Sequence, residues 1–164
     1  MRKLLLLLVA LFSIVGTMPG FAARRNIMDL PPFERAVLII KKFETLHKPR
    51  HWPAIGYGHM VQPGEPYRRG IQLSERQADI LLRNDLMKFV SLYKHMGKAD
   101  ALLLGTLAYN IGPAAVNKSS VYKKLQRGDR NIYKEYIAHC HYKGKRHSGL
   151  LKRRITEYSV LFVQ

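Results

Sequence analysis

Ile55-Gly56-Tyr57-Gly58-His59-Met60-Val61 is the stretch of sequence on which the fold prediction depends. Its alternating pattern and its two glycines predict a short, twisted hairpin strand. Before it, apolar residues recur at steps of three and four, which predicts an amphipathic helix over residues 33–46, opened by Pro31-Pro32. Residues 47–53, with two prolines and several basic or imidazole side chains, are predicted to form the loop between helix and hairpin.

Most of the remaining sequence is predicted to be helical. Ser74 and Gln77 have the spacing of a capping box and open a long apolar-periodic segment over residues 75–96, which Gly97-Lys98 ends. A second apolar helix is expected over residues 100–111. Three further helices are expected after it: from Ser119 or Ser120 to Gly128, over residues 130–140 with Asp129 as cap, and over residues 149–162.

The last of these helices is expected to turn its apolar residues toward the core: Leu150, Ile155, Val160, Leu161 and Phe162. One small hairpin among helices, with no internal repeat, predicts an α+β fold that is mainly helical. The long helix over residues 75–96 is expected to link two lobes.

Length and charge narrow the classes of protein. The 164 residues fit one domain, or two small lobes around a cleft. Apolar residues make up 47% and charged residues 24%, which argues against a disordered chain. The 28 Lys and Arg against 11 Asp and Glu give a net charge of +17, so an anionic partner is expected: nucleic acid, a membrane surface or an acidic polymer such as cell wall. A single cysteine, Cys140, excludes an intramolecular disulfide and a multi-cysteine zinc site.

Residues 1–23 have the layout of a secretory signal peptide. A basic start, Met1-Arg2-Lys3, precedes an apolar run and then small residues ending at Ala22-Ala23. The apolar core of about 12 residues is short for a membrane span. We expect cleavage there, an extended lead-in over residues 24–32, and a periplasmic or secreted protein, with an uncleaved membrane anchor as the alternative. Export makes cytosolic DNA binding a poor explanation of the positive charge.

Glu44 is the residue at which the sequence indicates chemistry. It lies at the end of an apolar helix, beside Phe43 and Leu46, and shortly before the glycine-rich hairpin. Desolvation between apolar packing and a cleft disfavours a charged carboxyl group, so such a group can hold a proton at neutral pH and give it to a leaving oxygen. On spacing alone, however, a glutamate at a helix end is better explained as a solvated surface residue.

Six short blocks of sequence follow one another between Phe33 and Phe162. They are Phe43-Glu44; Ile55-Gly56-Tyr57-Gly58-His59; Leu73-Ser74-Glu75-Arg76-Gln77-Ala78 with Leu82-Arg83-Asn84-Asp85-Leu86; Ala108-Tyr109-Asn110-Ile111-Gly112; Ser119-Ser120-Val121-Tyr122-Lys123-Lys124-Leu125; and Gly149-Leu150-Leu151-Lys152-Arg153-Arg154 with Glu157. In this order they resemble the bacteriophage-type lysozymes, glycoside hydrolase family 24. The resemblance is strongest to exported relatives carried on conjugative elements of Gram-negative bacteria.

This resemblance implies a lysozyme-like fold over residues 33–164, with a small β-hairpin lobe and a larger helical lobe. It implies cleavage of the β-1,4 bond between N-acetylmuramic acid and N-acetylglucosamine in peptidoglycan, with Glu44 as the acid and without a cofactor. Residues implied to bind substrate near the cleft are Tyr57, His59, Tyr109 and Asn110. The terminal helix of the family packs close to the acid, so Arg153 or Arg154 is expected to bear on Glu44; ordinary surface charge or pairing with Glu157 is the alternative.

The chain departs from the family pattern at the second carboxylate. Ala54 stands where the family has Thr, Glu44 precedes it by ten positions, and the loop is five residues shorter than in the family. Neither Asp nor Glu occurs between Thr45 and Gly64. Inverting glycosidases use a second carboxylate as base. Candidate substitutes are Glu65, His47 and His51.

Three mechanisms follow from that departure. Glu44 alone can serve a lytic transglycosylase, in which a sugar hydroxyl is the nucleophile; with a substitute base, water is the nucleophile; or catalysis is lost and the protein only binds wall. Expected partners are peptidoglycan strands and a conjugation or secretion apparatus, with no nucleic acid and a monomeric state. A cationic membrane-disrupting protein is a further alternative. A metal site at His139, Cys140 and His141 is not expected, because carboxylate ligands are missing.

Overall fold

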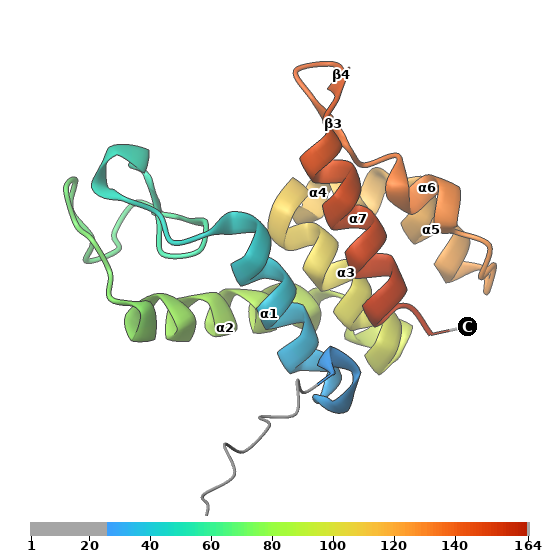
Figure 1. Cartoon of the computed structure of the whole chain (residues 1–164). Helices are drawn as coiled ribbons and strands as arrows, with labels where there is room; N and C mark the ends of the chain where they lie inside the picture. The colour runs from blue at the N-terminus through green and yellow to red at the C-terminus, as the bar shows by residue number, and fades with distance from the viewer. Residues whose placement is uncertain (1–25, 164) are drawn as a thin grey trace, which may run out of the picture.

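The computed structural model describes residues 26–163, which form helices and two small hairpins arranged in two lobes (Figure 1). The seven α-helices are α1 (Pro32–Glu44), α2 (Glu75–Leu92), α3 (Lys98–Ile111), α4 (Pro113–Lys118), α5 (Ser120–Gln126), α6 (Tyr133–Ile137) and α7 (Ser148–Leu161). The strands are β1 (Ala54–Ile55), β2 (His59–Met60), β3 (His141–Tyr142) and β4 (Lys145–Arg146). Short 3-10 helices cover Ile27–Asp29, Pro49–His51 and Lys94–Met96.

The small lobe is built around the predicted hairpin. Strands β1 and β2 are antiparallel, with Ala54 opposite Met60 and Ile55 opposite His59. The long helix α2 starts in this lobe and runs into the helical lobe, where it packs along α3 (Figure 1). The α+β class and the two-lobed lysozyme-like arrangement are therefore confirmed.

Helix α3 is the centre of the larger lobe. Every residue from position 101 to position 108 is buried, so the helix is surrounded by its neighbours. Gly105 allows α2 to approach, because a Cβ atom at this position would lie 2.8 Å from the Cα atom of Val90. This close packing joins the long helix to the core that holds the site described below.

Several boundaries differ from the prediction, each for a local reason. The lead-in is not fully extended, because Asn26 accepts a hydrogen bond from the backbone of Met28 and caps a 3-10 turn. Helix α1 ends at Glu44 rather than at residue 46, since Thr45 adopts a φ of 55°. The segment 75–96 is one α-helix followed by the 3-10 turn Lys94–Met96, and α3 begins at Lys98, directly after Gly97.

Two elements were missed and one cap was wrong. The first missed element is helix α4, which begins at Pro113; proline suits a first helical position. The hairpin β3–β4 was not predicted because its residues are polar and exposed. Asp129 does not cap a helix over residues 130–140: its Oδ1 atom accepts from the backbone of Asn131, and α6 begins only at Tyr133. Ser119 was correctly predicted as a cap, here of α5.

The predicted inner face of the last helix was partly wrong. Leu161 is buried, but Ile155 is exposed, and the other apolar residues expected inside, Leu150, Val160 and Phe162, are only half-buried. The fully inward positions of α7 are instead occupied by charged side chains: Arg153, Arg154 and Glu157.

The predicted signal peptide, residues 1–23, lies outside the described residues. In the part of the chain that is described, no helix is both long enough and apolar enough to cross a membrane.

Candidate active site

Glu44 is the last residue of α1 and lies where the hairpin β1–β2, α3 and α7 meet. Its side chain is half-buried, with 20% of its surface exposed. The helix ends at this residue because Thr45 leaves the helical conformation. Glu44 is thus held on a rigid element, at the end of a helix as the sequence indicated, and it lies at the junction of the two lobes.

One carboxylate oxygen of Glu44 is held by the helical lobe. Arg153 donates a hydrogen bond from Nη1 to Oε1, and Asn110 donates from Nδ2 to the same oxygen at 3.4 Å. The sequence left open whether Arg153 or Arg154 interacts with Glu44, and in the structure Arg153 does. Burial disfavours the charge of this guanidinium, but Glu157 and Glu44 outweigh burial and raise its pKa.

The other oxygen, Oε2, faces the hairpin and accepts no hydrogen bond from residues 26–163. Gly58 lies beside it with a φ of 98°, and a Cβ atom added there would lie 3.4 Å from Oε2. Glycine is favoured here because other residues rarely adopt this conformation, and a side chain would also lie in van der Waals contact with Oε2. One oxygen is therefore anchored and the other remains available.

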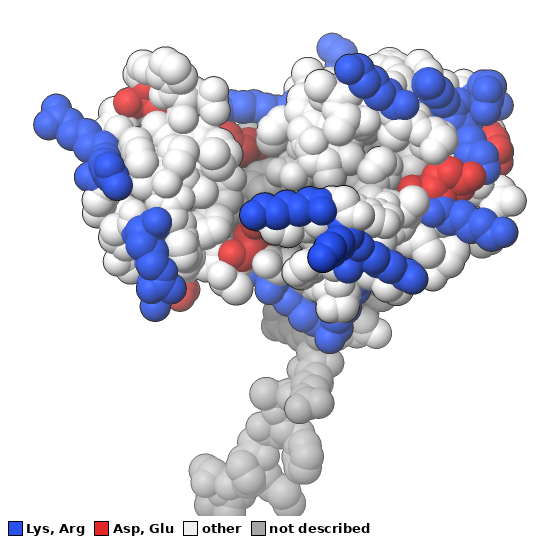
Figure 2. Space-filling model, turned by 90° about the horizontal axis from the view of Figure 1, so that it is seen from above, with Lys and Arg blue, Asp and Glu red and all other residues white. Residues whose placement is uncertain are grey.

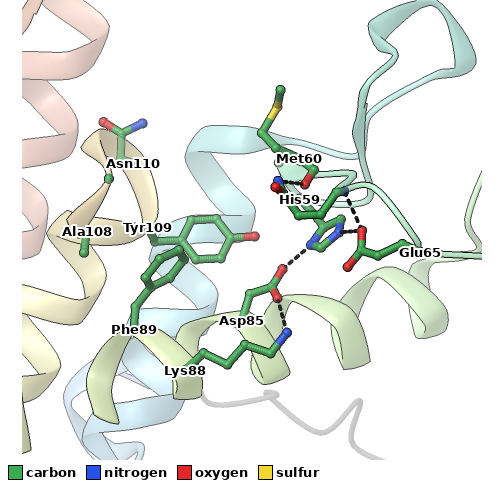
Figure 3. A pocket seen from close by; sticks show the side chains of 12 residues that line it. His59, Met60, Glu65, Asp85, Lys88, Phe89, Ala108, Tyr109 and Asn110 are labelled. Carbon is green, nitrogen blue, oxygen red and sulfur yellow. Dashed lines mark hydrogen bonds and ion pairs between the residues drawn. The ribbon is translucent and has the colours of Figure 1, made fainter. Parts of the chain in front are cut away.

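Two hollows meet at Asn110. The larger, of about 400 Å³, runs between the hairpin and α3 and is lined by Gly58, His59, Tyr109 and Asn110 among others (Figure 3). The smaller, of about 190 Å³, contains Glu44 itself, together with Asn110, His147 and Arg153. In the space-filling view a groove separates the two lobes, and some of the few acidic atoms lie within it (Figure 2). Glu44 lines the smaller hollow, and the two residues beside its carboxylate, Gly58 and Asn110, line the larger one.

The predicted sugar-binding residues are not equivalent. Tyr109 and Asn110 line the larger hollow and come from the end of α3. Tyr57 is 6% exposed, so its ring offers no open face for stacking; its backbone carbonyl accepts a hydrogen bond from the Tyr109 hydroxyl at 2.9 Å. Burial raises the pKa of Tyr109, which keeps this hydroxyl a donor.

His59 is also committed to the protein. Its Nδ1 atom lies 2.5 Å from Oδ2 of Asp85, and its Nε2 atom lies 2.8 Å from Oε2 of Glu65 (Figure 3). The hydrogen bond with Asp85 is the main reason that the pKa of His59 is raised. The imidazole joins the hairpin to α2 on one wall of the larger hollow, with neither ring nitrogen free for a sugar.

The three candidate substitute bases lie in different surroundings. Glu65 lines the larger hollow on the side opposite Asn110, and hydrogen bonds from the backbone of Gln62 and from His59 lower its pKa (Figure 3). His51 is exposed and lines neither hollow; slight burial and its cationic neighbours lower its pKa. His47 lies against His51, with ring centroids 5.1 Å apart, and also lines neither hollow.

A buried network lies behind Glu44. The sequence offered pairing of the arginines with Glu157 as the alternative to a contact with Glu44, and the structure shows both. It did not predict that Asn110 joins the network. Arg154 donates from Nη2 to Oδ1 of Asn110 at 2.8 Å, and Glu157 binds both arginines. The spacing of Arg153, Arg154 and Glu157 was a usable signal, because residues three and four apart share a helix face. Within residues 26–163, no group of three or more His, Cys, Asp or Glu side chains is placed to hold a metal ion.

Comparison with known proteins gives the family. The sequence profile of the phage lysozyme family matches residues 41–157, which include Glu44, the hairpin and the buried network. The chain belongs to the phage lysozyme family.

Similar proteins agree with this family assignment. The endolysin of Bacillus phage B103 is 29% identical over 137 residues. The match covers 76% of this chain and 51% of that endolysin, so the chain spans about half the length of this curated relative. The muramidase domain of SpmX from Asticaccaulis excentricus has a TM-score of 0.66 at 25% identity, over 79% of this chain and 95% of that one. An endolysin from Escherichia coli O157:H7 phage FAHEc1 has a TM-score of 0.63 at 26% identity, over 77% and 89%.

Proposed function

We propose that this phage lysozyme family member cleaves peptidoglycan at the β-1,4 bond between N-acetylmuramic acid and N-acetylglucosamine, with Glu44 as general acid. The observation that carries the proposal is the geometry of the Glu44 carboxyl group. Oε1 is anchored by Arg153 and Asn110, whereas Oε2 faces Gly58 at the groove between the lobes. An acid must be fixed in position and still reach the leaving oxygen, and this arrangement meets both needs.

In this mechanism Glu44 donates its proton to the glycosidic oxygen as the bond breaks. The sugar then carries positive charge, and in hydrolysis the attacking water must give its proton to a second group. Tyr109 and Asn110, at the end of α3, line the groove next to the acid and are proposed to contact the sugar. Glu65 is the carboxylate of the hairpin lobe that lines the same groove, and it is the candidate base for a water molecule.

A lytic transglycosylase is the second candidate function. The observation that favours it is the engagement of Glu65 by His59 and Gln62, together with the absence of any acidic residue between positions 45 and 64. If no side chain activates water, a hydroxyl group of the substrate becomes the nucleophile and gives its proton to the Glu44 carboxylate, which protonated the leaving oxygen in the preceding step. The product is then a 1,6-anhydro sugar rather than a reducing end.

Location and partners follow from the same proposal. The signal-peptide pattern of residues 1–23 supports export, with action in the periplasm or outside the cell. The net charge of +17 favours peptidoglycan, whose peptides carry carboxylates, and binding should weaken with salt. The resemblance to exported relatives on conjugative elements supports local wall opening for a conjugation or secretion apparatus.

The test of catalysis compares two isosteric variants on purified peptidoglycan. Glu44→Gln should lower the rate of turbidity loss by about 10²- to 10⁴-fold, because the amide cannot donate the proton that the leaving oxygen needs. Glu135→Gln, which removes a carboxylate of α6 that is paired with Lys124 of α5, should keep the wild-type rate. Inactivity of the wild-type protein, with binding retained, would instead indicate a wall-binding protein.

The test of mechanism is mass spectrometry of the soluble products. Reducing ends indicate that water is the nucleophile, and 1,6-anhydro ends indicate transglycosylation. Glu65→Gln adds a second discrimination: it should slow a hydrolase that uses Glu65 as base, and it should leave the chemistry of a transglycosylase in place.

A further inference from the structure

Glu157 is a carboxylate with no exposed surface, and the mechanism above does not use it. Its two oxygens have different partners. Oε1 accepts from Nε of Arg153 at 2.8 Å, while Oε2 accepts from the Tyr136 hydroxyl and lies 3.0 Å from Nη1 of Arg154. Burial is the main reason that the pKa of Tyr136 is raised, so its hydroxyl remains a donor to Glu157. Glu157 is therefore the common partner of three groups from α6 and α7.

Both arginines held by Glu157 are connected to Glu44, Arg153 by direct contact and Arg154 through Asn110. Arg153 binds Glu157 through Nε and Glu44 through Nη1, so one planar guanidinium bridges the two carboxylates. Arg154 donates to Oδ1 of Asn110, which turns the amide so that Nδ2 points at Oε1 of Glu44. Both groups that anchor Oε1 thus depend on Glu157, directly through Arg153 and through Arg154 for Asn110.

The charges of this cluster nearly cancel. Arg153 and Arg154 are 2% and 0% exposed and contribute two positive charges, and Glu157 contributes one negative charge. The ionised form of Glu44 contributes the second negative charge. Because buried charges interact strongly, removing the charge of Glu157 would leave two buried cations near Glu44, Arg153 in contact with it and Arg154 behind Asn110, and would favour its ionised form.

We propose that Glu157 is a positioning residue for catalysis, which orients Arg153 and Arg154 against Glu44 and offsets one of their charges so that Glu44 can take up its proton. The inference rests on the proposed role of Glu44 as general acid. The other titratable groups near this cluster are Tyr109 from α3, His147 at the start of α7, and His139, whose pKa is lowered by burial and by Arg154. None of them supplies a negative charge in place of Glu157.

The experiment is a pH profile of kcat/KM on purified peptidoglycan. Glu157→Gln keeps the shape of the side chain and removes its charge. The alkaline limb of this profile is the range in which activity falls because Glu44 has lost its proton. In Glu157→Gln this limb should move to lower pH by about one unit. At its optimum kcat should fall by roughly 10- to 100-fold while KM changes less than about threefold. Glu157→Asp, which keeps the charge, should return the limb to its wild-type position.

Asp100→Asn is the matched control, since it breaks the remote ion pair of Asp100 with Arg130. It should lower the midpoint of thermal unfolding without moving the limb. If Glu157→Gln is folded and keeps the wild-type kcat and limb, the inference is wrong. If it does not fold, Arg154→Met/Glu157→Gln removes one charge of each sign; its limb should match wild type with kcat still reduced, and an unchanged kcat would overturn the inference.

Glu44→Gln separates this inference from the proposed function. Activity retained in Glu44→Gln removes the proposed acid, and the role of Glu157 falls with it. Activity lost in Glu44→Gln, with a wild-type profile in Glu157→Gln, removes the role of Glu157 alone.

Discussion

The imidazole Nδ1 of His59 lies 2.5 Å from Oδ2 of Asp85, and this contact ties the hairpin of the small lobe to helix α2. On the other side of the ring, Nε2 contacts Glu65 at 2.8 Å. His59 is buried, so the contacts are shielded from water. Together they set the position of the hairpin that carries Gly58 next to Glu44.

We predict that this group stabilises the fold most strongly in mildly acidic solution. Asp85 and then Glu65 raise the pKa of His59 above 6.5, so its contribution is complete below about pH 6.5 and is lost as the pH rises through the raised value. The pKa of Glu65 lies below 4.5, so its contribution is present above about pH 4.5 and is lost on acidification. The two contributions therefore coincide between about pH 4.5 and 6.5.

His59→Gln measures the effect. We expect the free energy of unfolding in urea to fall by roughly 1–3 kcal/mol at pH 5.5, and by less at pH 9, because the contribution of the imidazolium charge declines as the pH rises through the raised pKa of His59. His95→Gln, at an exposed position on the 3-10 turn after α2, is the control and should show little change at either pH. A loss that does not vary with pH would show that the charge of His59 does not stabilise the fold.

Much of the fold could be predicted because apolar periodicity and turn residues act locally. Residues 33–46 and the hairpin at residues 55–61 were recognised in this way, and so were Ser74 and Ser119 as caps. The prediction failed where long-range contacts decide. Helix α7 turns Arg153 and Glu157 inward and Ile155 outward because the arginines find carboxylates on α1 and on their own helix.

The sequence could single out Glu44 as the candidate acid, but it could not show what surrounds this residue. Glu44 and Asn110 lie in blocks that the family resemblance identified, and they meet across 66 positions of sequence. No local pattern could show that Tyr57 would be buried, that His59 would be held by Asp85, or that Glu65 would lie across the groove from Asn110. These are consequences of how the hairpin packs on α2 and α3.

Gly58→Ala should impair catalysis more than stability explains. Alanine at this position must keep the backbone φ of 98°, and its methyl group would lie 3.4 Å from Oε2 of Glu44. We expect a stability loss of about 1–2 kcal/mol from the backbone conformation, and a fall in kcat of about tenfold or more because the methyl group occupies the space beside the oxygen that is proposed to give up the proton. Gly70→Ala is the control: its φ is 93°, but nothing lies within 4 Å, so it should lose similar stability and keep its activity. Equal activity of the two variants would contradict the proposed role of Oε2.

Gly105→Ala should destabilise the helical lobe although alanine favours helices. A Cβ atom at this position would lie 2.7 Å from Cγ2 and 2.8 Å from the backbone Cα and N of Val90. Because two of these atoms belong to the backbone of α2, the helices must move apart, and we expect a net loss of about 1–3 kcal/mol in urea unfolding. The double variant Gly105→Ala/Val90→Ala should remain destabilised. Full recovery in that variant would show that only the valine methyl group limits the approach.

Substitution of the basic hairpin β3–β4 should weaken binding to the wall more than the same loss of charge elsewhere. Lys143, Lys145 and Arg146 are exposed and form no ion pair with residues 26–163. The next residue, His147, lines the hollow that contains Glu44, so the carboxylates of peptides on a bound glycan would pass close to this hairpin.

Changing Lys143, Lys145 and Arg146 to Gln should weaken cosedimentation with sacculi several-fold in 50 mM salt and much less in 500 mM salt, where charges are screened. The control changes Lys118, Lys123 and Lys134 to Gln on the outer helices; an equal loss there would mean that only net charge matters.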